Sequence, residues 1–237
     1  MAAPGDWRAV RGVLLDVGGV FVVPRPAAIG AVVEPFGGVG EYETVLRAHG
    51  VAMARADSSG GFDWDTYRRE LLLACEVPAG VLAECSQAVT EAMASTPFWW
   101  SEQLPGAAAA VRTLTGMLPV GIVSNSDGTV QELLATLGVC QVGPGAGAEV
   151  RVIVDSAVVG VAKPDPAIFA SALAALEVDS GAIAYVGDTV AFDVTGARAA
   201  GLLPVHVDTY GLCPAPDGHA HVASLAEFVA ALAAERG

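Results

Sequence analysis

Short apolar runs alternate with longer amphipathic segments over most of the chain. The apolar runs lie at residues 13–15, 120–123, 150–154, 157–159, 183–186 and 203–207. Runs of this length that end at glycine or polar residues are typical of buried parallel strands. The segments between and after them have helical spacing and lie at residues 105–117, 129–137, 166–176, 192–200 and 224–235, with Ser224 as the expected N-cap of the last. This alternation predicts an α/β fold, a doubly wound, Rossmann-like parallel sheet.

Residues 23–100 have a different pattern, because no strand run is visible there. The spacing predicts helices over 41–49, 64–76 and 79–95, with Gly50 ending the first, Asp63 capping the second and a loop at 57–61. Pro24 and Pro26 are expected to break any regular element at the entry. We therefore predict an all-helical cap at 23–100, inserted into a core formed by 1–22 and 101–237.

Composition narrows the class of partner. The chain has 237 residues, is 53% hydrophobic and has a formal net charge of -14, which disfavours nucleic acid and anionic membranes. No apolar stretch is long enough to span a membrane, and Asp16 with two glycines interrupts the first run, so no signal peptide is expected. Four scattered cysteines predict neither a disulfide framework nor a zinc site and favour a reducing cytoplasm.

Polar residues follow three of the predicted strands. Asp16 follows the first, Ser124 and Asn125 follow the second, and Asp188 comes after residues 183–186. Because parallel strands end at one edge of a sheet, these side chains should converge there. The chain's only lysine, Lys163, lies between prolines in a stiff turn before a helix.

These residue types suit phosphoryl chemistry. Asp16 and Asp188, with Asp193 five residues after Asp188, form a cluster of carboxylates suited to Mg²⁺. The Ser124 hydroxyl, the Asn125 amide and the Lys163 ammonium suit the oxygens of a phosphoryl group. A carboxylate beside a metal and a lysine can act as a nucleophile and form an aspartyl-phosphate.

Other candidates are weaker. His49 is a cap residue near a predicted helix end, and Trp99 and Trp100 are expected to pack at the hinge between the domains. His219 and His221 form an HxH pair in a loop. Without further ligands nearby, that pair does not predict a metal site.

The segments LLDVGG, IVSNS, AKPDPAIF and YVGDTVAFD occur in this order. They resemble the four motifs of the haloacid dehalogenase-like hydrolase superfamily, and the helical insertion resembles its mobile cap. The resemblance implies Asp16 as nucleophile, with Ser124 and Lys163 as further catalytic residues that hold the phosphoryl group. It implies a Mg²⁺ site formed by Asp16, the Gly18 carbonyl, Asp188 and Asp193, and substrate contacts from Gly18, Gly19, Ser124, Asn125 and Lys163.

The sequence departs from that pattern at Gly18. Most phosphatases of this superfamily have a second Asp there, which protonates the leaving group. Such a general acid is typically worth about 10²–10⁴-fold in rate. Three explanations remain open: a substrate with a good leaving group, a proton donor elsewhere, with His49 as the first candidate, or a weak catalyst used for binding.

The favoured function is a Mg²⁺-dependent cytoplasmic phosphatase acting on a small-molecule phosphate ester, as a monomer or homodimer. A haloacid dehalogenase is the first alternative, since that chemistry needs no second Asp, but the acidic pair Asp188 and Asp193 would repel a haloacid. A non-catalytic binding or regulatory protein is the second. A phosphonate hydrolase that uses a cap lysine is excluded, because residues 23–100 contain no lysine.

Overall fold

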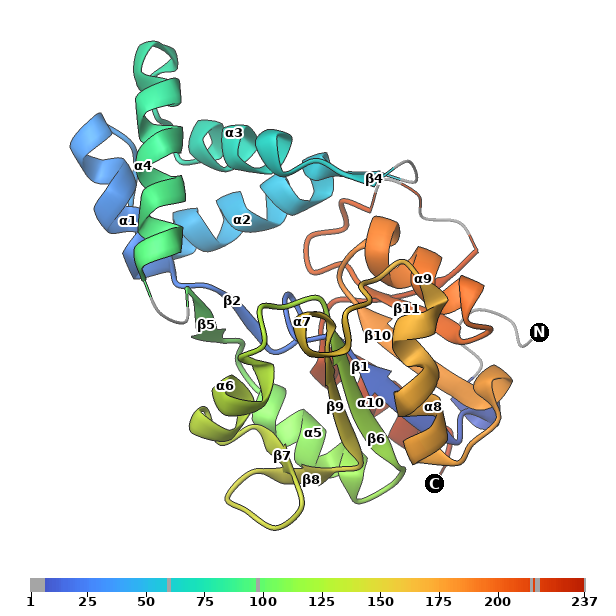
Figure 1. Cartoon of the computed structure of the whole chain (residues 1–237). Helices are drawn as coiled ribbons and strands as arrows, with labels where there is room; N and C mark the ends of the chain where they lie inside the picture. Colours follow the sequence, from blue (N-terminus) through green and yellow to red (C-terminus); the bar gives the residue numbers. More distant parts are fainter. Residues whose placement is uncertain (1–6, 59–60, 97–98, 214, 216–217, 237) are drawn as a thin grey trace.

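A six-stranded parallel sheet forms the centre of the computed structural model, which describes residues 7–58, 61–96, 99–213, 215 and 218–236 (Figure 1). The strand order is β12-β11-β10-β1-β6-β9, and every neighbouring pair is parallel. The strands are β1 Gly12–Leu15, β6 Val120–Ser124, β9 Val152–Asp155, β10 Ile183–Gly187, β11 Leu203–Val207 and β12 Ala220–Val222. The chain runs from β1 outward to β9 and then returns to the other side of β1. The switch point, where such sheets bind ligands, therefore lies between β1 and β10.

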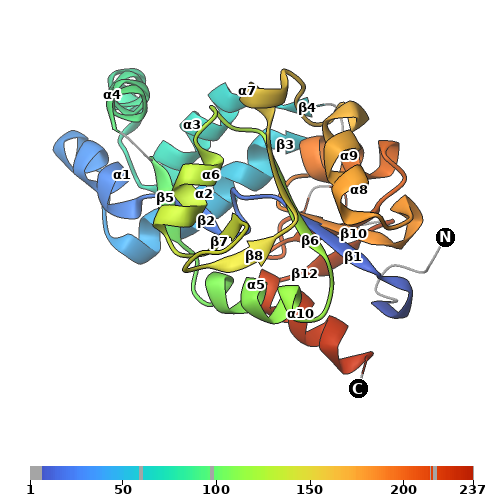
Figure 2. The same ribbon diagram turned by 60° about the horizontal axis from the view of Figure 1, so that its bottom comes forward.

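Helices cover both faces of the sheet, as predicted (Figures 1 and 2). They are α5 Ala107–Thr115, α6 Val130–Thr136, α7 Ser156–Val159, α8 Ala170–Leu176, α9 Thr195–Ala199 and α10 Leu225–Ala234. Successive residues of β1 point to opposite faces. Val13 and Leu15 pack in a cluster with residues of α5, α6 and α10, whereas Leu14 packs in another with residues of α8 and α9.

The cap has a hydrophobic cluster of its own and stands beside the sheet (Figure 1). Its helices are α1 Pro26–Val33, α2 Tyr42–Ala56, α3 Trp64–Ala74 and α4 Leu82–Ser95. An antiparallel pair, β2 Val22–Pro24 and β5 Trp100–Gln103, connects it to the core. Trp100 packs against the clusters of both parts, as the predicted hinge role requires. We propose that the domain boundary lies within this two-stranded connection.

Several local predictions are confirmed. Asp63 caps α3 by accepting a hydrogen bond from the Asp65 amide, and Ser224 caps α10 by accepting one from the Glu227 amide. All four cysteines are free thiols.

The prediction that Gly50 ends its helix is wrong, because α2 continues to Ala56. A Cβ at Gly50 would lie 2.2 Å from Cε2 of Tyr210, so the glycine allows a loop of the core to approach the helix. Close packing against Tyr210, rather than the end of a helix, explains why this position is a glycine.

Three local predictions need correction. Residues 157–159 belong to α7, whose first turn is capped by the Asp155 carboxylate. The predicted cap loop contains the paired strands β3 Asp57–Ser58 and β4 Gly61–Phe62, so the cap is not entirely helical; residues 59 and 60 lie outside the described part. Pro24 ends β2 at a register shift, where a proline is tolerated.

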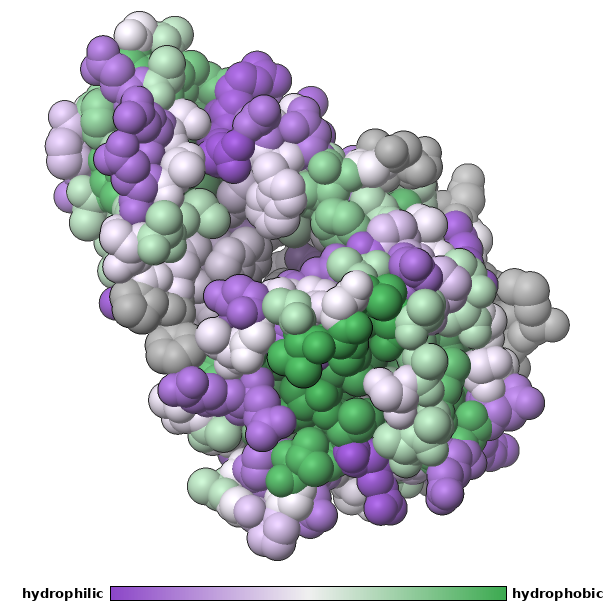
Figure 3. Space-filling model, viewed as in Figure 1, coloured by the Kyte–Doolittle hydropathy of each residue, from purple (hydrophilic) through white to green (hydrophobic). Residues whose placement is uncertain are grey.

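Besides β2 to β5, three short strands of the core escaped prediction: β7 Cys140–Val142 and β8 Ala148–Val150, which pair with each other, and β12 at the edge of the sheet. Each has three residues, too few for a periodic pattern to be visible. Figure 3 shows hydrophobic residues gathered on the visible face of the core. Val158 and Val159 of α7 are exposed hydrophobic residues. Among the described residues, no helix is long and apolar enough to cross a membrane.

Candidate active site

The residues predicted at the strand ends do converge. Asp16 follows β1, Ser124 ends β6 and Asp188 follows β10. Together with Lys163 they line one cavity of about 790 Å³, which the cap closes from the other side. The hollow between the two parts is visible in Figure 3. These residues therefore meet because the strands that carry them end at the same edge of the sheet.

Lys163 is the centre of the charge cluster and is only 3% exposed. Its Nζ atom lies 2.9 Å from Oδ1 of Asp16 and 2.7 Å from Oδ1 of Asp193. It also donates a hydrogen bond of 2.7 Å to the hydroxyl of Tyr185, which in turn donates to the Val123 carbonyl. Sequence reasoning missed Tyr185, although a tyrosine inside an otherwise apolar strand needs a partner for its hydroxyl.

The electrostatics of the cluster are unbalanced. Burial lowers the pKa of Lys163, but the carboxylates of Asp16 and Asp193 more than offset this, so its pKa lies above the usual value. Burial raises the pKa of Asp16 to about 6, against the lowering effect of Lys163. Burial, together with Asp193 and Asp16, raises the pKa of Asp188 well above its usual value. One ammonium thus faces three carboxylates.

This donor set fits a hard divalent cation. Asp16, Asp188 and Asp193 each offer a carboxylate oxygen, and these atoms lie within 4.8 Å of one another. Oδ1 of Asp16 is buried and accepts no hydrogen bond, although it forms the ion pair with Lys163. A buried carboxylate oxygen that accepts no hydrogen bond, among carboxylates that outnumber the ammonium, can serve as a ligand to Mg²⁺.

Asp193 differs from the other two carboxylates because its oxygens already have several donors. Oδ1 faces Lys163 and Tyr185, while Oδ2 accepts hydrogen bonds from the amides of Asp188 and Thr189 and from the Thr189 hydroxyl. Lys163 lowers the pKa of Asp193 despite its burial, so the group stays ionised. These contacts orient Lys163 and the chain at Asp188, and they leave Asp193 less available as a direct metal ligand than predicted.

Asn125 lines the cavity, and its carboxamide also contacts the backbone of Lys163. Its Nδ2 donates to the Lys163 carbonyl at 3.0 Å, and its Oδ1 accepts from the Lys163 amide at 2.8 Å. Both ends of the carboxamide are therefore engaged by one backbone unit. The arrangement makes Asn125 a positioning residue for Lys163.

Gly18 and Gly19 are adjacent but not equivalent. Gly19 has a φ of +63°, and a Cβ there would lie 2.1 Å from Oδ2 of Asp188. This position requires glycine, because a side chain would displace the carboxylate. At Gly18 a Cβ would make ordinary contact, 3.5 Å from the Trp100 ring, and its φ lies outside the left-handed region. The residue that replaces the expected acid is therefore not required by the backbone.

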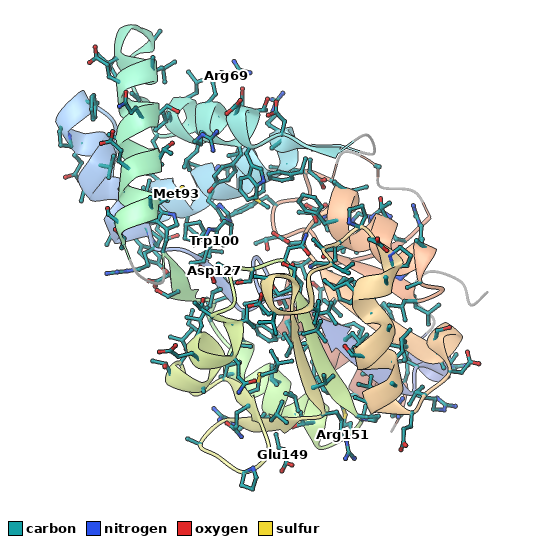
Figure 4. The ribbon with its side chains drawn as sticks, in the orientation of Figure 1. Arg69, Met93, Trp100, Asp127, Glu149 and Arg151 are labelled. Carbon is teal, nitrogen blue, oxygen red and sulfur yellow. The ribbon has the colours of Figure 1, made fainter. Side chains whose placement is uncertain are left out.

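The cap presents mainly apolar side chains to the cavity. Met53, Phe62, Trp64, Met93 and Trp100 line it, and Figure 4 shows Met93 and Trp100 where the cap faces the core. Among the described lining residues, Lys163 is the only cation. The part of a substrate that the cap covers would therefore meet an uncharged surface.

His49, the first candidate for a proton donor, does not line this cavity. It is buried, and its Nδ1 lies 3.0 Å from the hydroxyl of Tyr67. Burial lowers the pKa of His49 to about 3, so the imidazole is neutral near pH 7. A neutral ring with so acidic a conjugate acid is a poor general acid at that pH.

Two carboxylates missed in the sequence hold the surroundings of the site. Asp57 in the cap accepts hydrogen bonds from the amides of Val190 and Ala191, at 2.6 and 2.8 Å, and so ties the cap to the turn that carries Asp193. Asp155 accepts from the amides of Gly128 and Val130 and fixes the loop after β6. Neither role has a local pattern, because the partners lie 133 and about 25 residues away.

The family model described as haloacid dehalogenase-like hydrolase matches residues 10–201. A phosphoserine phosphatase from Thermus thermophilus is 44% identical over 73 residues, which are 31% of this chain and 29% of that protein. The chain spans no more than 40% of the length of the curated relatives that it matches.

Two solved structures have the same fold over nearly the whole chain. A HAD phosphatase from Thermococcus onnurineus has a TM-score of 0.59 at 20% identity, covering 96% of this chain and all of that one. A 2-haloacid dehalogenase from Pseudomonas syringae has a TM-score of 0.55 at 21% identity, covering 95% and 99%. At this identity the likeness concerns the fold.

Proposed function

Because the chain belongs to the haloacid dehalogenase-like hydrolase family, we propose that it is a Mg²⁺-dependent phosphatase whose nucleophile is Asp16. The observation that carries the proposal is the buried cluster in which Lys163 lies 2.9 Å from Asp16 while three carboxylates face a single ammonium. A haloacid would add negative charge without a cation. A phosphate ester that arrives with Mg²⁺ adds no net charge to the cluster.

The reaction has two displacements. A carboxylate oxygen of Asp16 attacks phosphorus, the ester P–O bond breaks, and the leaving oxygen departs as an anion that takes its proton from solvent. Water then attacks the phosphorus of the aspartyl-phosphate, the P–O bond to Asp16 breaks, and phosphate leaves. The Lys163 ammonium and the Ser124 hydroxyl stabilise phosphoryl oxygens in both steps. Bound Mg²⁺, held by Asp16, Asp188 and the Gly18 carbonyl, would withdraw charge from the transferring group.

The cavity favours one class of ester. Its cap side is apolar, and Gly18 provides no proton for the leaving oxygen. We therefore expect aryl and acyl phosphates with uncharged leaving groups to be preferred. Phosphoserine carries an ammonium and a carboxylate, which would need charged partners that the described cap lining does not supply.

A panel of phosphate esters assayed with and without Mg²⁺ tests the proposal. We expect Mg²⁺-dependent release of phosphate and, after acid quench, a phosphoryl group on the peptide that contains Asp16. A matched assay with 2-chloropropionate, read as chloride release without metal, tests the dehalogenase alternative that Gly18 permits. Chloride release without phosphatase activity would overturn the proposal, and the absence of both from folded, Mg²⁺-binding protein would favour a binding role.

A further inference from the structure

Three imidazoles and a thiol gather at the β11–β12 edge of the sheet, outside the carboxylate cluster. His206 lies on β11, His221 on β12 and His219 just before β12, while Cys213 comes from the loop between the strands. One donor atom from each of the four lies within 4.8 Å of all the others. The HxH pair therefore has the two further ligands whose absence had argued against a metal site.

Strand pairing explains why the histidines meet. His206 and His221 are direct partners in the parallel register of β11 and β12. His219 is two residues before His221, which places it on the same side of an extended chain. The ring centroids lie 4.5 Å apart for His219 and His221, and 5.4 and 5.5 Å from His206 to His221 and His219.

The donor distances match those of a tetrahedral centre. Sγ of Cys213 lies 3.2 Å from Nδ1 of His206 and 3.7 Å from Nε2 of His219. Bond lengths of 2.0–2.1 Å to nitrogen and 2.3 Å to sulfur around a tetrahedral Zn²⁺ imply N···S separations of about 3.6 Å. The two separations from the Cys213 sulfur are therefore close to those of a bound ion, and all four donor atoms lie within 4.8 Å of one another.

Outer contacts orient two of the rings as in known metal sites. Nε2 of His206 lies 2.9 Å from the Asp188 carbonyl, so it carries the proton and Nδ1 points its lone pair toward Cys213. Nδ1 of His221 lies 3.5 Å from Oδ2 of Asp208. Asp208 also accepts hydrogen bonds from the amides of Leu212 and Cys213, and so folds the loop that supplies the thiol. A carboxylate or carbonyl behind each histidine fixes the tautomer of a ligand.

One contact opposes metal binding. Nη2 of Arg198 lies 3.4 Å from Nδ1 of His219, and this long hydrogen bond must break if Nε2 is to bind an ion. Burial also raises the pKa of the Cys213 thiol, so ion binding must displace its proton. Both costs are included in any measured affinity.

We propose that His206, Cys213, His219 and His221 form a zinc site, separate from the Mg²⁺ site of the carboxylates. Three imidazoles with one thiolate suit a borderline ion such as Zn²⁺ and are poor ligands for Mg²⁺ or Ca²⁺. Four protein ligands leave no open position, which is the arrangement of a structural site.

The site would hold the loop that touches the cap. Tyr210, three residues before Cys213, packs against Gly50 of α2, and the Arg47 guanidinium lies 6.0 Å from the centroid of its ring. His206 and Cys213 also line a cavity of about 340 Å³ together with His49 and Asp57 of the cap. Zinc would thus fix the position of Tyr210 beneath the cap and, through His206, the chain at Asp188.

Cobalt titration of chelator-treated protein tests the proposal. Excess Mg²⁺ keeps the carboxylates occupied, and Co²⁺ replaces Zn²⁺ as a spectroscopic probe. We expect one equivalent to give a thiolate-to-cobalt charge-transfer band and intense tetrahedral d–d bands, both abolished by Zn²⁺. Competition with a chelator should give a Kd for Zn²⁺ of about 50 nM or tighter. An absent charge-transfer band or a weaker affinity in folded protein would overturn the proposal.

Variants separate ligands from neighbours. Cys213→Ser should remove the charge-transfer band, and His221→Ala should weaken Zn²⁺ binding by more than about 100-fold, whereas Asp208→Asn should keep the band and cost about 10–100-fold. Cys85→Ala, which removes a buried thiol of the cap, is the matched control and should leave both readouts unchanged. Circular dichroism of each metal-free variant establishes that it is folded. A band that survives in Cys213→Ser, or disappears in Cys85→Ala, contradicts the assignment.

Discussion

The core and the cap face the same cavity with opposite chemistry. The core contributes Asp16, Lys163 and Asp188, which are charged and held by a dense set of hydrogen bonds and ion pairs. The cap contributes methionine and aromatic side chains. The difference indicates that the reacting groups belong to the core, whereas the side chains that would cover the substrate belong to the cap. The buried carboxylate of the cap, Asp57, serves the interface with the core instead of the cavity.

Replacing Asp16, the proposed nucleophile of the core, should have the largest effect on the rate of turnover. Asp16→Asn is nearly isosteric and keeps the shape of the site, but an amide does not form an acyl phosphate. We expect kcat to fall by at least about 10⁴-fold, measured on an aryl phosphate at saturating Mg²⁺. The melting temperature should not fall, because the variant removes one of three crowded carboxylates. A residual rate above one per cent of wild type would place the nucleophile elsewhere.

Replacing the ammonium should have the next largest effect. Lys163→Met keeps the length of the side chain and leaves phosphoryl charge uncompensated, so we expect kcat to fall by about 10²–10³-fold. The variant also leaves Asp16 and Asp193 without their partner, so the free energy of unfolding should fall by about 3–5 kcal/mol. Steady-state kinetics and denaturant unfolding in the same Mg²⁺ buffer measure the two effects. Normal kcat in a folded variant would return Lys163 to a structural role.

The sequence predicted the core better than the cap, for physical reasons. Buried strands that end in Asp16, Ser124 and Asp188 have local patterns, and the parallel sheet brings their ends together without further information. Gly50 and Asp57 were misjudged because each is explained by a segment more than 130 residues away: Tyr210 packs on Gly50, and the amides of Val190 and Ala191 bind Asp57. The HxH pair was discounted for a different reason: the register of β11 and β12, which places His206 opposite His221, has no signal in the sequence.

Adding a carboxylate at position 18 of the core should change the rate less than the two substitutions above, because it would supply only the missing general acid. Without a general acid, the rate should depend steeply on the pKa of the leaving group in a series of aryl and alkyl phosphates. Gly18→Asp should raise the rate for alkyl phosphates by about 10–100-fold and flatten the dependence. A flat dependence in the wild type, with chemistry shown to be rate-limiting, would indicate a proton donor other than residue 18.

Two alanine variants control for backbone effects in that experiment. Gly18→Ala should be tolerated, because its Cβ has 3.5 Å to the Trp100 ring. Gly19→Ala should impair Mg²⁺ binding, because its Cβ would lie 2.1 Å from the Asp188 carboxylate and φ is +63°. Equal damage by both would mean that the turn as a whole requires glycine.

The smallest effect should come from the cap, at His49, and it appears in stability as a function of pH. Burial lowers the pKa of His49 to about 3 in the folded protein, from 6.5 in the unfolded chain. Between these values the unfolded state binds more protons, so the free energy of unfolding falls as pH falls from about 6.5 toward 3. The contribution of this one group approaches about 1.4 kcal/mol per pH unit within that window and vanishes above it.

Denaturant unfolding at pH 7, 6 and 5, followed by tryptophan fluorescence, measures the slope. His49→Phe keeps the ring contacts with Tyr67 and Trp100 and removes the titration, so its curve should be flatter by that amount. Tyr67→Phe removes the hydroxyl partner but keeps the imidazole, so it should retain most of the wild-type slope. If His49→Phe and wild type lose stability in parallel, the imidazole accepts a proton inside the folded cap, and the cap is less apolar at that position than its packing indicates.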